Sequence, residues 1–145
     1  MGFIFESAGI ALLYGLVGFV VMLAGFVVLD LLTPGKLAAV VWTDRNKGAA
    51  VVLGGQMLGL GWVIAQAIGA SESEAGLAEG LFSTFLYGAA GVVMMTLVFV
   101  MVAVLTPGRL GATVFDDEGG RPHPAAWVQA TMYLGTALMI GAALT

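Results

Sequence analysis

Four long stretches of the chain contain no Asp, Glu, Lys or Arg. They run from Ser7 to Leu29, from Gly48 to Ser71, from Gly80 to Gly108 and from Pro122 to Thr145. Each is longer than the roughly 20 residues that cross a hydrocarbon core about 30 Å thick. Backbone amides in lipid must be bonded within the segment, so such spans form helices. The sequence predicts four transmembrane helices at about residues 8–32, 49–70, 81–105 and 125–144.

Composition agrees with a membrane protein and excludes several other classes. Of the 145 residues, 60% are hydrophobic and 10% are charged, whereas a soluble domain has roughly a quarter charged residues. The chain has no cysteine, so a thiol nucleophile, an iron–sulfur cluster and a cysteine-bound zinc are excluded. A net charge of -4 offers no basic face for nucleic acid. The partner expected from composition alone is the lipid bilayer.

The basic residues predict how the helices are oriented. All of them lie in the first and third connecting segments, which hold Lys36, Arg45, Lys47, Arg109 and Arg121. The positive-inside rule places these two segments in the cytoplasm and both termini on the outer side. Lys36 to Trp42 combines a basic start, an apolar body and an aromatic end, as does its counterpart from Arg109 to Phe115. We expect both to lie in the cytoplasmic interface, after the first and third helices, with Trp42 in the aromatic belt.

An internal repeat predicts the arrangement of the bundle. Leu13-Tyr14-Gly15 matches Leu86-Tyr87-Gly88, and Thr33-Pro34-Gly35 matches Thr106-Pro107-Gly108, both at a shift of 73 residues. We expect an all-α membrane protein built from two tandem helix-loop-helix repeats, at residues 1–75 and 76–145. Because each repeat crosses twice, both have the same orientation and are related by a pseudo-two-fold axis along the membrane normal.

Small residues at helical spacing predict close helix packing. Gly55-x-x-x-Gly59 and Thr131-x-x-x-Gly135 are pairs that allow backbones to approach each other. Gly15, Gly18 and Gly25 fall on one face of the first helix. These pairs serve either packing inside the chain or a homo-oligomer contact, and the sequence leaves both open.

Four polar side chains within the spans form a candidate intramembrane polar site: Asp30, Gln56, Gln66 and Gln129. Asp30 is either a proton or cation site within the bundle, or an acid paired with Lys36 or Arg109 at the membrane surface. The second repeat has Ala103 at the position equivalent to Asp30. The glutamines either join helices by hydrogen bonds or line a wet path.

The sequence predicts no catalytic, cofactor or metal site. Asp116, Asp117 and Glu118 with His123 carry ligand-type atoms, but the calcium-loop spacing is missing and Gly119-Gly120 does not fix their geometry. We expect a solvated loop there. One histidine cannot complete a known catalytic motif with these loops, so an enzyme is not expected.

The chain resembles the DUF 350 family of uncharacterised bacterial inner-membrane proteins. The resemblance rests on Asp30-x-x-Thr33-Pro34-Gly35, on Asn46-Lys47-Gly48-Ala49-Ala50 and on the duplicated layout. The second copy departs from it at Ala103 and at Arg121-Pro122-His123-Pro124. The resemblance implies a cytoplasmic-membrane protein without an established activity, sometimes encoded near envelope-stress and peptide-ligase-like genes. It implies no catalytic residues.

Two functions of different classes fit these features. The first is a non-enzymatic membrane scaffold or accessory subunit, as a homo-oligomer or with another membrane protein, linked to envelope maintenance or stress. The second is a small channel or a proton- or cation-coupled carrier that uses Asp30 and the intramembrane glutamines. An intramembrane enzyme is a third and weaker interpretation.

Overall fold

The computed structural model describes residues 1–32, 37–71, 76–105 and 120–145. Within these ranges the chain forms five helices: α1 (Gly2–Leu32), α2 (Leu37–Trp42), α3 (Lys47–Ser71), α4 (Leu77–Leu105) and α6 (Pro124–Leu144). Four of these, all except the short α2, are long and apolar enough to cross a membrane. The prediction of an all-helical protein with four transmembrane segments is therefore confirmed.

The predicted helix bounds are accurate for two helices and too short for the other two. α3 and α6 begin and end within two residues of the predicted positions. α1 begins at Gly2 instead of residue 8, and α4 at Leu77 instead of residue 81. The added turns contain Glu6 and Glu79, and residues 2–13 are exposed. A run without charges gives only a minimum length for the helix, because a helix can continue past a charged residue.

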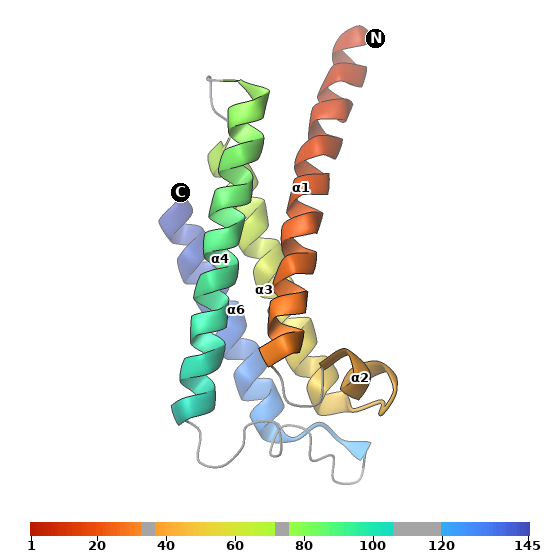
Figure 1. Ribbon diagram of the computed structural model, residues 1–145, viewed down its shortest axis with the longest axis vertical. Coiled ribbons are helices and arrows are strands. Elements are labelled where there is room, and N and C mark those ends of the chain that lie inside the picture. Colours follow the sequence, from red (N-terminus) through yellow and green to blue (C-terminus); the bar gives the residue numbers. More distant parts are fainter. Residues whose placement is uncertain (33–36, 72–75, 106–119) are drawn as a thin grey trace.

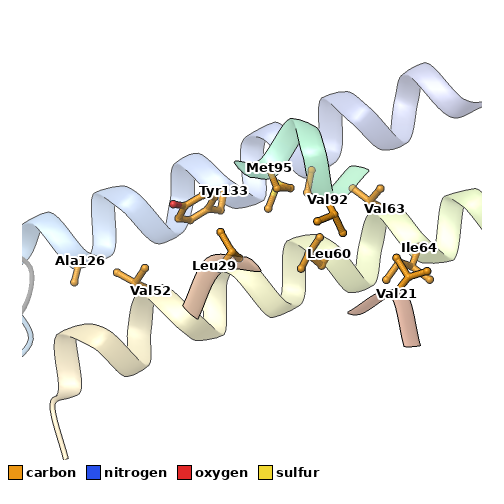
Figure 2. Close-up of a cluster of buried hydrophobic side chains, with 11 residues drawn as sticks. Val21, Leu29, Val52, Leu60, Val63, Ile64, Val92, Met95, Ala126 and Tyr133 are labelled. Atoms are coloured by element: carbon orange, nitrogen blue, oxygen red, sulfur yellow. The ribbon is translucent and has the colours of Figure 1, made fainter. Parts of the chain in front are cut away.

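Figure 1 shows α1 and α4 running in one direction, with α3 and α6 running the opposite way. Both termini consequently lie away from the end of the bundle at which α3 and α6 begin. α3 packs against α6, α4 and α1, and its contact with α6 is the most extensive. Figure 2 shows the apolar core between them, which includes Val21, Leu29, Leu60, Val63, Met95 and Tyr133.

Glycine at two positions of α3 allows the close approach of α6. A Cβ atom at position 55 would lie 2.7 Å from the Cβ of Ala130 and 2.8 Å from its Cα. A Cβ at Gly59 would lie 3.2 Å from the Cβ of Ala137. The Gly55-x-x-x-Gly59 pair thus serves packing inside the chain. At Gly135 on α6, in contrast, a Cβ would meet nothing within 4 Å, so this glycine does not contribute to the contact.

The corresponding helices of the two halves share some packing positions and differ at others. Gly18 of α1 and its equivalent Gly91 of α4 both pack against α3, whereas Gly15 meets nothing within 4 Å and its equivalent Gly88 packs against Val21. Tyr14 is 8% exposed and its equivalent Tyr87 is 42% exposed. The internal repeat and its pseudo-two-fold axis remain predictions from the sequence, and the predicted boundary at residue 75 lies outside the described residues.

Candidate functional site

Asp30, in the last turn of α1, is tied to the start of α2. Its side chain is half-buried, and its Oδ1 accepts a hydrogen bond from the backbone amide of Ala38 at 2.7 Å. The first amides of a helix have no partner within the helix, and an acidic side chain satisfies them well. The proposed ion partners, Lys36 and Arg109, lie outside the described residues. In the described structure Asp30 acts as a helix cap.

The short helix α2 is held against the bundle by its apolar side. Val40 and Val41 pack against the cluster around Ala49 and Leu53 of α3. The ring of Trp42 meets the ring of Phe26 of α1 edge-on, with centroids 6.3 Å apart and planes at 89°. Trp42 is nonetheless 66% exposed. The result is a fixed surface at the end of the bundle where α1 ends and α3 begins (Figure 1).

The described basic residues gather at this same end. Lys47 Nζ donates to the backbone carbonyl of Gly120 at 2.6 Å, which joins the beginning of α3 to the segment before α6. Arg45 and Arg121, each within two residues of one partner of this contact, are exposed, and Arg45 has a left-handed backbone with φ of 52°. The cytoplasmic interface predicted from charge thus has three of its basic residues on one end of the molecule. Which side of the membrane this end faces stays a prediction.

Side chains also cap α3 and α6. Asn46 Oδ1 accepts from the amide of Ala49 at 2.8 Å, and His123 Nδ1 accepts from the amide of Ala125 at 3.0 Å. His123 therefore orders the start of α6. Its neighbours in the sequence, residues 116–118, lie outside the described residues. In the part of the chain that the structure describes, no group of three His, Cys, Asp or Glu residues could hold a metal ion.

Two of the predicted glutamines face each other across the α3–α6 contact. Gln129 is 3% exposed and donates from Nε2 to the hydroxyl of Tyr133 at 3.2 Å. Gln56 on α3 is fully buried beside the same hydroxyl, although its amide does not meet the geometry of a hydrogen bond. We call Gln56, Gln129 and Tyr133 the buried polar layer. Sequence reasoning missed Tyr133, although its spacing of four residues from Gln129 places both on one face of a helix.

Gln66 lies apart from this layer. Its Cγ is 3.0 Å from the position that a Cβ on Gly141 would occupy, beside Trp62. Ten residues, from 56 to 66, separate the two glutamines of α3, or about 15 Å of helix. The four predicted polar residues thus have different surroundings: Asp30 is bonded to α2, Gln56 and Gln129 lie with Tyr133 between α3 and α6, and Gln66 lies beside Trp62. The structure does not bring them together into one site.

Comparison with known proteins identifies the family. The family model described as "Domain of Unknown Function (DUF350)" matches residues 3–144. The chain belongs to the DUF350 family. It is 34% identical over 142 residues to a UPF0719 transmembrane protein of Mycolicibacterium paratuberculosis, covering 98% of this chain and 91% of that protein. It is 37% identical over 135 residues to a UPF0719 transmembrane protein of Mycobacterium bovis, covering 92% and 84%. No solved structure matches.

The resemblance to DUF350 inferred from short motifs is thus confirmed at the level of the family. Two residues of those motifs have a structural explanation. Asp30 caps α2 and Asn46 caps α3, so both stabilise the ends of helices where the first connecting segment turns back into the bundle. In this DUF350 chain, Asp30 and Asn46 therefore stabilise the starts of α2 and α3.

Proposed function

We propose that this chain is a non-enzymatic membrane scaffold or accessory subunit of the bacterial cytoplasmic membrane, serving envelope maintenance or stress. The observation that carries the proposal is the hydrogen bond from the Ala38 amide to Asp30 Oδ1. This bond gives Asp30 a structural role, because it fixes the start of α2 against the end of α1. The proposal includes the orientation expected from the positive-inside rule, with both termini on the outer side and α2 on the cytoplasmic side.

The surface offered to a partner is α2 and the turn that follows it. Asp30 holds the first turn of α2, and the Phe26–Trp42 contact holds its end. An ordered surface binds a partner without first losing conformational freedom. Exposed Trp42 and Arg45 provide an aromatic ring and a guanidinium group, two side chains that are enriched in protein interfaces.

Assembly with a second copy is part of this proposal. Thr131 is exposed on α6, and Gly135 one turn later has nothing packed where its Cβ would be. Small residues that are not used for packing within the chain permit a close contact with another helix in lipid. This supports a homo-oligomer or another membrane protein as the neighbour of α6.

A channel or a proton- or cation-coupled carrier is the second candidate. The observation that favours it is Gln56, whose amide is fully buried and has no hydrogen-bond partner within the described residues. Unpaired polar groups inside a bundle are found along the paths of transported ions. Against it, about 15 Å of helix separates Gln56 from Gln66, and the Asp30 carboxylate is bonded to α2.

Flux through liposomes separates the two candidates. Purified protein is reconstituted and tested for movement of protons, alkali cations and small solutes under imposed gradients, beside Asp30→Asn and Gln56→Leu variants. We expect no flux above that of empty liposomes. A flux that either substitution abolishes would overturn the scaffold proposal and support the carrier.

Photo-crosslinking in intact cells tests the scaffold directly. A photoreactive amino acid is placed at Trp42 on α2, or at Trp62, which is 46% exposed on α3 and serves as the matched control. We expect a discrete protein adduct at position 42 that weakens when Asp30→Ala is added, because α2 is then less well fixed. Lipid adducts alone at position 42 would count against a partner on this surface.

A further inference from the structure

The starts of α3 and α6 lie beside each other at one end of the bundle. The two helices run in the same direction and share the most extensive helix contact of the molecule (Figure 1). The hydrogen bond of 2.6 Å from Lys47 Nζ to the carbonyl oxygen of Gly120 joins the first residue of α3 to the segment in front of α6. Because each helix carries a partial positive charge at its start, two such charges lie close together at this end.

The positive ends of α3 and α6 carry neutral caps. In both of these fully described helices the first turn holds no acidic residue. The caps are the side-chain amide of Asn46 and the unprotonated Nδ1 of His123, which accepts from the amide of Ala125. Carboxylates are favoured near helix starts because they compensate the dipole. Without them, the paired starts keep a positive potential that favours a bound anion.

An arginine occupies the same position in front of each of these helices. Arg45 precedes the first Ala-Ala pair of α3 by four residues, and Arg121 precedes the first Ala-Ala pair of α6 by four. Both are exposed, and neither side chain forms a hydrogen bond or an ion pair within the described residues. Consecutive Cα atoms are about 3.8 Å apart, so each arginine backbone lies within about 8 Å of one partner of the Lys47–Gly120 contact. The two guanidinium groups are therefore available to one ligand at this end.

Arg45 has a backbone conformation that glycine adopts more easily. Its φ is 52°, in the left-handed region. The next amide, that of Asn46, donates to the carbonyl of Val40 at 3.1 Å. This bond is typical of a helix end at which the left-handed residue is usually glycine. The backbone thus gains nothing from an arginine at position 45, and the contribution of this residue is its guanidinium group.

We infer that Arg45 and Arg121 bind the phosphate of an anionic lipid headgroup at the starts of α3 and α6. Guanidinium groups bind phosphate oxygens through paired hydrogen bonds, and Lys47 fixes the two segments that carry the arginines. Trp42 is 66% exposed at the same end, and exposed tryptophan is typical of the headgroup level of a bilayer. A headgroup bound there would be part of the surface that a partner of α2 meets, but the inference rests on the bilayer and not on the scaffold function.

Native mass spectrometry of the whole chain, released from membranes of equal parts phosphatidylglycerol and phosphatidylcholine, tests the inference. We expect adducts of phosphatidylglycerol to exceed those of phosphatidylcholine severalfold, and this excess to fall in Arg45→Gly and in Arg121→Gln. Arg45→Gly suits the left-handed backbone and should fold at least as well as the unaltered chain, so a lost adduct is not a lost fold. Asp44→Asn changes an exposed neighbouring charge and should keep the excess. Equal numbers of the two lipids on the unaltered chain, or an excess that both arginine substitutions leave unchanged, would overturn the inference.

Thermal unfolding in detergent separates a lipid headgroup from a free anion. Added phosphatidylglycerol should raise the unfolding midpoint of the unaltered chain, and raise it less in the double variant Arg45→Gly with Arg121→Gln. Inorganic phosphate alone should leave the midpoint of both unchanged. Equal protection by inorganic phosphate would show a general anion site and overturn the lipid headgroup as its ligand.

Discussion

Asp30 and Ala38 are joined by a 2.7 Å hydrogen bond from the backbone amide of Ala38 to the carboxylate of Asp30. The bond links the last turn of α1 to the first turn of α2 across residues 33–36. The sequence predicts Asp30 to be part of a membrane span. In the structure its side chain joins α1 to α2.

Substitution of Asp30 separates the capping role from a role of its charge. We expect Asp30→Ala to lower the free energy of unfolding by about 0.5–2 kcal/mol, as for other lost caps. Asp30→Asn keeps an oxygen acceptor and should retain most of this stability. Thermal unfolding in detergent measures the effect, with exposed Asp44→Ala as the control. If Asn were as damaging as Ala, the charge and not the acceptor would be the important property.

Glycine at position 55 should be far less replaceable than glycine at position 135. In Gly55→Ala the new methyl group meets the backbone of Ala130, so the two helices must separate, at a cost of about 1–3 kcal/mol. In Gly135→Ala the methyl group meets nothing of its own chain within 4 Å, so the stability of the monomer in detergent should be unchanged or slightly higher. Unfolding of the two variants side by side provides the comparison. Equal losses would mean that α6 is covered at Gly135 by a second molecule.

The contact of Phe26 with Trp42 should contribute a measurable coupling energy. A double-mutant cycle with Phe26→Leu and Trp42→Leu is expected to give about 0.5–1.5 kcal/mol, the range for edge-to-face aromatic pairs. Trp127 on α6 replaces Trp42 in the control cycle, which should give a value near zero. A coupling near zero for Phe26 and Trp42 would show that α2 does not hold its place against α1.

The predicted topology can be tested by labelling, because the chain has no cysteine of its own. Arg45→Cys and Arg121→Cys should react with an impermeant maleimide in inverted membrane vesicles and not in intact cells from which the outer membrane has been stripped. Glu79→Cys, in the first turn of α4, should show the opposite pattern. Labelling of all three from one side would contradict the proposed orientation.

Local patterns in the sequence account for the helices and for the α3–α6 contact. A charge-free run specifies a lipid crossing by its length alone, which is why α3 and α6 lie within two residues of their predicted bounds. The Gly55-x-x-x-Gly59 spacing likewise identifies a face on which backbones meet. These features depend on neighbours within one helix.

Contacts between elements were harder to predict. The partner of Asp30 is a backbone amide eight residues away. Almost every residue has a backbone amide, so the residue types in the sequence do not identify this partner. Tyr14 and Tyr87 occupy equivalent positions in the sequence, yet one is buried and the other is 42% exposed, because burial depends on how α1 and α4 are rotated against α3. For the same reason the four polar residues that share a property in the sequence have different neighbours in the structure.

The unequal lengths of the helices determine how the protein fits its bilayer. α1 has 31 residues and α6 has 21, which correspond to about 46 Å and about 32 Å of helix. A hydrocarbon core about 30 Å thick matches α6, but α1 carries exposed apolar residues such as Phe3, Phe5 and Leu12 far along its length. Helices with such a mismatch tilt, or the lipid around them thickens. The thickness of the surrounding bilayer therefore bears on the tilt of α1, and through its contacts with α3 and α4 on the packing of the bundle.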